Sequence, residues 1–302
     1  MGVYWGGEWL PEQIHSIQNQ THKNWFLYAS DDGSDEHTAE LLLHAKNKLR
    51  EEFGVDRMRI ARGPQRGFVH NFLKMVCDQT IVGDYFAFSD QDDIWDANKL
   101  EKAVAWLQKV DPAVPACYCG RTRLVSSIGA WQGYSPLFKK PPSFKNAIAQ
   151  SIAGGNTMVF NGAARRLLQA AGCVDVVSHD WWVYISITAC GGHVNYDPIP
   201  TLSYRQHDHN IVGQNTSWSA RSRRIVMLLR GDFRGWTDQN IAALELLRPY
   251  LTFESARDFE RFKRARTSVL PIRMVRYYRC GIYRQTLLGG FGLLVAALLN
   301  KL

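Results

Sequence analysis

The chain has 302 residues, of which 46% are hydrophobic and 21% are charged. This composition is typical of a globular protein and excludes a disordered, collagenous or coiled-coil chain. The formal net charge of +8 at pH 7 favours an anionic partner such as a phosphorylated substrate, a membrane surface or a nucleic acid. The six cysteines are scattered without a C-x-x-C pair, which indicates a reducing compartment rather than a disulfide scaffold.

Apolar periodicity predicts alternating helices and short strands. In chain order we predict a helix over 7–20, a strand over 25–30, a helix over 38–50, a strand over 56–61, a helix over 69–77, a strand over 85–88 and a helix over 99–109. Repeated strand–loop–helix units predict an α/β fold around a mostly parallel sheet. Ligands bind beyond the carboxyl ends of such strands, where two acidic clusters of this chain lie.

The second acidic cluster, Asp90-Gln-Asp-Asp93, directly follows the strand predicted over 85–88. Carboxylates two positions apart at a strand end can converge on Mg²⁺ or Mn²⁺, which also hold phosphate. The alternative is that Asp92, Asp93 or Asp96 caps the next helix. These residues alone leave both interpretations open.

The first cluster, Asp31-Asp-Gly33, follows the strand predicted over 25–30. It has the composition of an Asp-Gly turn, with Ser34 or Asp35 as the N-cap of the next helix. The functional alternative is that one carboxylate accepts hydrogen bonds from a nucleobase or ribose. Alone, the segment favours the turn.

Two later segments also carry candidate chemistry. His179-Asp180-Trp181-Trp182 places an acid beside aromatic rings, which suits a general base next to a bound sugar; the alternative is a helix cap with core tryptophans. His207 lies in a polar loop, where histidine is usually surface but is also a good metal ligand.

Six segments in this order resemble the motifs of glycosyltransferase family 2, and within it the bacterial rhamnosyltransferase-like group of polysaccharide assembly. The resemblance runs from residue 6 to about residue 213, roughly two thirds of the chain. The segments are 13–21, 30–34, 89–95, 155–161, 179–182 and 204–207.

The resemblance implies a GT-A type fold over residues 1–215, with a Rossmann-like, mostly parallel sheet flanked by helices. Its nucleotide half would cover about 1–110 and its acceptor half about 111–215. Residues 216–302 would form a basic, helical, amphipathic C-terminal region. Relatives carry Tyr-Asn-Gly where this chain has Tyr4-Trp-Gly6. The strand expected before Tyr4 is absent, so we expect upstream coding sequence for an apolar strand.

The resemblance also assigns roles to individual residues. The implied site comprises the catalytic base Asp180, the nucleotide-binding residues Tyr4, Asp31, Asp32, Arg66 and Asp90, the Mg²⁺ or Mn²⁺ ligands Asp92 and His207, and the acceptor-binding residues Asn156, Thr157, Trp181 and Trp182.

The implied reaction is metal-dependent, inverting transfer of a sugar to a hydroxyl of a lipid-linked cell-surface glycan. The expected donor is dTDP-L-rhamnose, with a UDP-sugar as the alternative. A non-catalytic sugar-nucleotide-binding relative would lack the base or the metal ligand, and both are present. No nucleic-acid-binding module is visible, so we expect no nucleic-acid partner.

The C-terminal region indicates a membrane-associated protein. The apolar run 287–299 is too short to cross a bilayer as a helix. Arg273, Arg276, Arg279 and Arg284 alternate with apolar and aromatic residues, which predicts a helix in the headgroup region of an anionic membrane. The alternative is that the run packs on the enzyme's own core or on a second subunit. The first ten residues do not resemble a signal peptide, so the expected location is cytoplasmic, peripheral at the inner face of the cell membrane.

Overall fold

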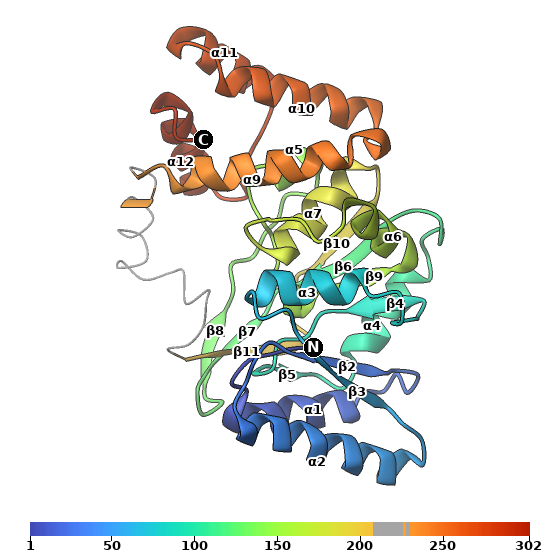
Figure 1. Ribbon diagram of the computed structural model, residues 1–302. Coiled ribbons are helices and arrows are strands. Elements are labelled where there is room, and N and C mark those ends of the chain that lie inside the picture. Colours follow the sequence, from blue (N-terminus) through green and yellow to red (C-terminus); the bar gives the residue numbers. More distant parts are fainter. Residues whose placement is uncertain (208–225, 228–229) are drawn as a thin grey trace.

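The computed structural model describes residues 1–207, 226–227 and 230–302. The boundary predicted between residues 215 and 216 lies outside these ranges. Within them, sheets form the middle of the molecule, helices cover both sides, and the C-terminal helices gather at one end (Figure 1). The predicted α/β class is confirmed, as are the seven elements predicted up to residue 109.

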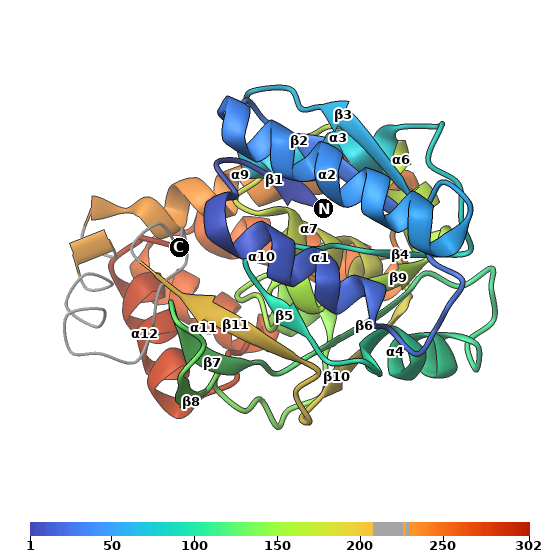
Figure 2. The same ribbon diagram turned by 90° about the horizontal axis from the view of Figure 1, so that it is seen from below.

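The N-terminal sheet is parallel, in the order β1-β2-β3. Its elements and their helices are β1 (Gly2–Val3), η1 (Gly7–Trp9), α1 (Leu10–Gln18), β2 (Leu27–Asp31), α2 (Glu36–Phe53), β3 (Met58–Arg62) and α3 (Phe68–Cys77). Helices α1 and α2 lie side by side on one face of this sheet, and α3 lies on the other (Figures 1 and 2). Helix α2 begins where the Asp35 carboxylate accepts a hydrogen bond from the Thr38 amide at 3.0 Å.

Strand β1 corrects one expectation from the sequence. Its two residues pair with Ser30 and Asp31 of β2, immediately before Tyr4. The Gly2 amide also donates a hydrogen bond to the Ser89 carbonyl at 3.1 Å. A strand is therefore present before Tyr4, over two residues between β2 and the chain that follows β4, and the coding sequence expected upstream of it stays a prediction.

The rest of the sheet structure is mixed. A second sheet has the order β10-β6-β9-β4, and a third has the order β5-β11-β7-β8. The strands are β4 (Tyr85–Ala87), β5 (Ile94–Trp95), β6 (Ala116–Gly120), β7 (Arg123–Ser126), β8 (Trp131–Tyr134), β9 (Val159–Asn161), β10 (His193–Asp197) and β11 (Leu202–Gln206). In contrast to the N-terminal sheet, each of these sheets contains one parallel pair, β10 with β6 and β11 with β7, and two antiparallel pairs.

The remaining helices cover the second sheet and continue to the C-terminus. They are α4 (Lys99–Leu107), α5 (Phe144–Ala147), η2 (Gly155–Thr157), α6 (Gly162–Ala171), α7 (His179–Ala189), α9 (Asp232–Leu246), η3 (Arg248–Tyr250), α10 (Phe253–Arg266), α11 (Leu270–Cys280) and α12 (Leu287–Leu298). Leu244 of α9 and Phe259 and Phe262 of α10 are buried in the same core as α7. The first C-terminal helices are therefore packed parts of the protein.

The last two helices have one packed and one exposed side. Ala296 and Ala297 of α12 are buried, whereas Leu287 is 93% exposed. Arg273 of α11 is also buried, which corrects the expectation that it faces a membrane with its neighbours. In the described part of the chain, a helix with the length and apolarity for crossing a membrane does not occur.

Candidate active site

A cavity of about 1690 Å³ opens beyond the carboxyl ends of β2 and β4. This is the position that the strand–loop–helix pattern predicts for a ligand. The predicted site residues that line it are Tyr4, Asp32, Asp90, Asp92, Asn156, Asp180 and His207. The structure thus brings together seven residues that come from both the N-terminal sheet and the later segments.

Asp31 and Asp32 both have structural partners. The Asp31 carboxylate accepts hydrogen bonds from the Ser34 amide and hydroxyl at 2.9 and 2.6 Å, so it closes the predicted turn. The Asp32 carboxylate accepts from the amides of Gln65 and Gly67 at 2.6 and 2.9 Å. Of the two carboxylates, only that of Asp32 lines the cavity. The loop over 63–67 is therefore held against the end of β2.

Gly63 is the residue that allows this close approach. A Cβ atom at Gly63 would lie 2.5 Å from Asp32 Oδ1 and 2.8 Å from Asp32 Cα. Neither atom has room to move, because the carboxylate is already bound to the loop and Cα is backbone. Glycine is therefore required there.

Gln91 fixes the position of Tyr4. Its side-chain Oε1 accepts from the Tyr4 amide at 2.8 Å, and its Nε2 donates to the Tyr4 carbonyl at 2.7 Å. The amide thus pairs with the backbone as a neighbouring strand would. Gln91, the middle residue of the Asp-Gln-Asp segment, had no predicted role, and it holds Tyr4, a predicted nucleotide-binding residue, at the cavity.

Asp92 and His207 come together as the resemblance implies. Asp92 Oδ2 lies 2.7 Å from His207 Nε2, and both side chains are largely buried. Trp9 stacks on the His207 ring at a centroid distance of 4.2 Å. Trp9 was not a predicted site residue, and only the fold places it beside a histidine almost two hundred positions away.

Arg205 holds the backbone at Asp92, one member of the Asp92–His207 pair. Its guanidinium is buried and donates to the Asp92 carbonyl at 3.1 Å and to the Ser127 carbonyl at 2.7 Å. It also forms an ion pair with Glu12. Arg205 belongs to the motif over 204–207, and that membership was the signal from which its role could have been inferred.

The carboxylates of the site repel one another. Burial, together with the negative charges of Asp92 and Asp180, raises the pKa of Asp90 to about 7. A divalent cation would relieve this repulsion. Within the described residues, no three His, Cys, Asp or Glu side chains form a complete metal site. However, Mg²⁺ commonly takes only one or two carboxylates when phosphates supply other ligands, so Asp92 and His207 fit such an ion.

Asp93 links the loop over 90–93 to the segment over 154–157. Its Oδ2 accepts from Asn156 Nδ2 at 2.8 Å, and both residues are buried. Burial and the charges of Asp92 and Asp90 raise the pKa of Asp93 well above its ordinary value. The pKa of Lys99, which is buried near it, is lowered to about 7 by its own burial. The helix-cap alternative for this loop is wrong, because α4 has Asn98 as its N-cap.

Asp180 lies in the first turn of α7. Its Oδ1 accepts from the Ser178 hydroxyl and from the Trp181 amide, and its Oδ2 accepts from the Gly155 amide at 3.1 Å. These three hydrogen bonds fix the orientation of the Asp180 carboxyl group at the N-terminal end of the helix. Gly155 is as constrained as Gly63, since a Cβ there would lie 2.3 Å from His179 Nε2.

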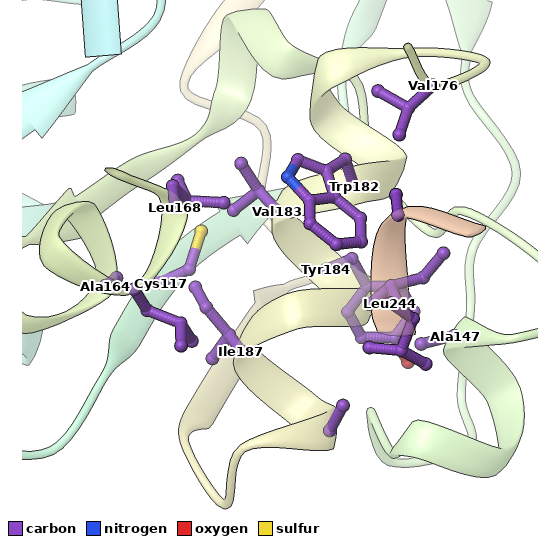
Figure 3. Close-up of a cluster of buried hydrophobic side chains, with 14 of the residues drawn as sticks. Cys117, Ala147, Ala164, Leu168, Val176, Trp182, Val183, Tyr184, Ile187 and Leu244 are labelled. Atoms are coloured by element: carbon purple, nitrogen blue, oxygen red, sulfur yellow. The ribbon is translucent and has the colours of Figure 1, made fainter. Parts of the chain in front are cut away.

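Some predicted residues lie away from the cavity lining. Arg66 is 3.8 Å from Asp175, with a largely exposed side chain. Thr157 is buried, and its hydroxyl donates to the Gly154 carbonyl at 2.8 Å. The Trp181 indole donates to the Ala147 carbonyl at 2.6 Å. Trp182 is fully buried in the larger core (Figure 3), so the expectation that its ring contacts an acceptor is corrected: it is a core residue.

Comparison with known proteins gives the family. A family model described as "Glycosyl transferase family 2" matches residues 2–168. Over 243 residues the chain is 28% identical to the dTDP-rhamnosyl transferase RfbG of Shigella flexneri, which covers 76% of this chain and 78% of that protein. It is 34% identical over 105 residues to the glucosyltransferase WfgD of Escherichia coli, covering 33% of this chain and 36% of that protein.

Solved structures show the same fold. The mannosyltransferase PcManGT of Pyrobaculum calidifontis has a TM-score of 0.51 at 17% identity, with 99% of this chain and 84% of that one covered. TarS of S. aureus, residues 1–349, has a TM-score of 0.54 at 12% identity, with 92% and 78% covered. The predicted GT-A type fold is confirmed. Because the family model covers more than half of the sequence, the chain belongs to glycosyl transferase family 2.

Proposed function

We propose that this glycosyltransferase transfers L-rhamnose from dTDP-L-rhamnose, with inversion, to a hydroxyl of a lipid-linked cell-surface glycan. The observation that carries the proposal is the meeting of Asp180, the Asp92–His207 pair and Tyr4 at one cavity. The name of RfbG supports the donor. A UDP-sugar is the second candidate, supported by the name of WfgD, a UDP-Glc-dependent glucosyltransferase.

In the proposed reaction Asp180 acts as the general base. Its carboxylate takes the proton of the acceptor hydroxyl, whose oxygen forms a bond to the anomeric carbon. The bond from that carbon to the diphosphate breaks on the opposite face, and its electron pair leaves with the nucleoside diphosphate. The configuration inverts, and the carboxyl group of Asp180 retains the proton.

Asp92 and His207 are the proposed ligands of Mg²⁺ or Mn²⁺. When bound, the ion supplies positive charge that stabilises the diphosphate leaving group. Arg205 and Trp9 hold the two ligands in place through the Asp92 carbonyl and the His207 ring. The structure of PcManGT, a complex with GDP-Man and Mn²⁺, supports this role in a protein of the same fold.

The proposed domain boundaries are those that the family resemblance implies. We propose a nucleotide half over about 1–110, which holds Tyr4, Asp32 and Asp90, and an acceptor half over about 111–215, which holds Asn156 and Asp180. Residues 216–302 are the proposed basic, helical, amphipathic C-terminal region.

A panel of nucleotide sugars tests the donor. The full chain is incubated with dTDP-L-rhamnose, UDP-glucose and UDP-N-acetylglucosamine in the presence of Mg²⁺ or Mn²⁺, and binding and slow hydrolysis are measured. We expect dTDP-L-rhamnose to bind and hydrolyse fastest. Preference for a UDP-sugar would establish the UDP-sugar as the donor. Binding without hydrolysis or transfer would show that the chain is a non-catalytic sugar-nucleotide-binding protein.

The last two helices support peripheral attachment at the inner face of the cell membrane. The sequence after Glu260 contains nine Lys and Arg residues and no acidic residue. On α12, Leu287, Leu288 and Phe291 are 93%, 67% and 64% exposed. Apolar side chains near arginines suit binding to an anionic lipid surface, where the attraction of each basic residue contributes roughly 1 kcal/mol to the binding free energy.

Co-sedimentation of the full chain with vesicles tests this attachment. We expect salt-sensitive binding to vesicles that contain phosphatidylglycerol and little binding to pure phosphatidylcholine. Combined serine substitutions at Leu287, Leu288 and Phe291 should abolish it. Serine substitutions at three exposed apolar residues on other elements, Val82, Ile128 and Ile199, are the matched control. Unchanged sedimentation of the α12 variant, or a change only in its oligomeric state, would contradict attachment.

A further inference from the structure

Trp5 has a backbone conformation that its side chain disfavours. Its φ is +51°, in the left-handed region, where a bulky residue is a real outlier. Asparagine and glycine adopt this conformation at lower cost in conformational free energy. A tryptophan therefore stands where a smaller residue would fold more easily.

The neighbouring contacts impose this conformation without using the indole. The Trp5 amide donates to Ser34 Oγ at 2.9 Å. On the other side, Gln91 pairs with both backbone groups of Tyr4. Because these bonds involve the backbone of residues 4 and 5, they would remain with a different side chain at position 5.

The indole itself contributes little burial to folding. Trp5 is 58% exposed and lines the cavity, beside Tyr4, which is 60% exposed. The two ring centroids are 6.4 Å apart, at an interplanar angle of 68°. Strained backbone retained at a cavity is a sign of function, and two exposed rings there offer contact area to a planar ligand.

The surroundings of Trp5 indicate which planar ligand its ring would contact. Ser34 Oγ, which accepts from the Trp5 amide, itself donates to Asp31 at the end of β2. Asp180, the proposed general base, is held by a different part of the chain, namely α7 and the segment over 154–157. Trp5 therefore lies at the end of the cavity beyond β2, where nucleotide folds bind the base and ribose.

We infer that Trp5 contacts the nucleobase of the donor, as a second aromatic ring beside Tyr4, and so sets the affinity of this chain for its nucleotide. The inference rests on the proposed function, because it requires a nucleotide in the cavity. Stacking of a base on an aromatic side chain changes affinity by roughly 5- to 150-fold.

Calorimetric titration of the full chain with dTDP and with UDP, in Mg²⁺, tests the inference. We expect Trp5→Asn to weaken the better-bound nucleotide about tenfold or more while the melting temperature stays equal or rises. Trp5→Phe, which keeps a ring, should lose less. Affinity for pyrophosphate, which has no base, should not change. Trp131→Asn is the matched control, because Trp131 is 66% exposed but does not line the cavity.

The outcomes separate this inference from the proposed function. If the wild-type chain binds neither nucleotide, both fail. If it binds nucleotide and Trp5→Asn binds equally well, only the role of Trp5 is overturned. Unchanged nucleotide affinity with a raised KM for the acceptor overturns the nucleobase assignment and moves the indole to the acceptor.

Discussion

At the scale of single residues, Asp180 carries the most specific prediction. Asp180→Asn keeps the size of the side chain but removes its capacity to accept a proton. Transfer should fall by about 10²- to 10⁴-fold, the usual contribution of a general base, while nucleotide affinity stays within a few-fold. Product formation and calorimetric titration with dTDP measure the two effects.

Ser178→Ala is the control for Asp180. It removes one hydrogen bond to the carboxylate but leaves the proton acceptor in place, so its loss of turnover should be much smaller. Equal losses of transfer and of nucleotide affinity in Asp180→Asn would make the residue structural.

The proposed metal ligands give the second prediction at this scale. Asp92→Asn weakens the partner of His207 and removes a charge that would bind the cation, so turnover should fall by orders of magnitude with the fold intact. EDTA should have the same effect on the wild-type chain. Asp96→Asn is the control from beyond the adjacent strand β5, because Asp96 pairs with Arg123 rather than with the site. Full activity after both EDTA and Asp92→Asn would refute the metal assignment.

Much of the site could be predicted at the residue level, but not the contacts behind it. Asp92 and Asp180 carry charge in recognisable motifs, so sequence alone indicates them. Trp9 and Gln91 act through a ring stack and a backbone pairing, which depend on the fold and have no local signal. The prediction for Trp182 was wrong for the same reason, because a tryptophan beside the proposed general base gives the same sequence pattern whether it faces the cavity or the core.

At the scale of elements, the 3-10 turn η2 gives a third prediction. Gly155→Ala would place a Cβ 2.3 Å from His179 Nε2, so the turn must shift away from Asp180. We expect a lower melting temperature and a loss of turnover of tenfold or more. Both are measured on the purified full chain.

Gly235→Ala provides the matched control for this substitution. Gly235 lies inside α9, and nothing lies within 4 Å of its Cβ position. The change should raise stability by roughly 0.5–1 kcal/mol, because alanine favours the helix more than glycine does. A neutral Gly155→Ala would mean that the close approach to His179 has no importance.

Elements were more predictable than their pairing. Every helix and strand predicted up to residue 109 is present, because apolar periodicity and turn residues act over short distances. The antiparallel pairing of β4 with β9 joins segments more than seventy residues apart, and no local pattern encodes it. The two-residue strand β1 was missed because it is too short to show a period.

At the scale of the whole molecule, stability should depend on pH through His179. Burial among aromatic rings lowers its pKa from 6.5 to about 4, although the charge of Asp180 acts in the opposite direction. Below pH 6.5 the unfolded chain takes up a proton at His179 and the folded chain does not. The contribution of His179 to the free energy of unfolding should therefore decrease by up to about 3 kcal/mol as the pH falls from about 6.5 to about 4. Asp90 and Asp93, whose pKa values are raised in the folded chain, contribute in the opposite direction, so His179 is tested by comparison with a variant.

Urea unfolding at several pH values between 7.5 and 4.5 measures this decrease. His179→Gln removes the titrating group, so the free energy of unfolding of the wild-type chain should decrease relative to that of the variant over the same range. A variant with the same pH dependence as the wild-type chain would assign the acid sensitivity to other groups.

The loop over 90–93 couples the effects of substitutions in several distant segments. Its consecutive side chains Gln91, Asp92 and Asp93 each bind a different distant segment. Substitutions in those segments therefore share one neighbour, and their effects should not be additive. A lineage that acquires a new donor or acceptor would have to alter several of these positions together, or else vary side chains that the loop does not hold.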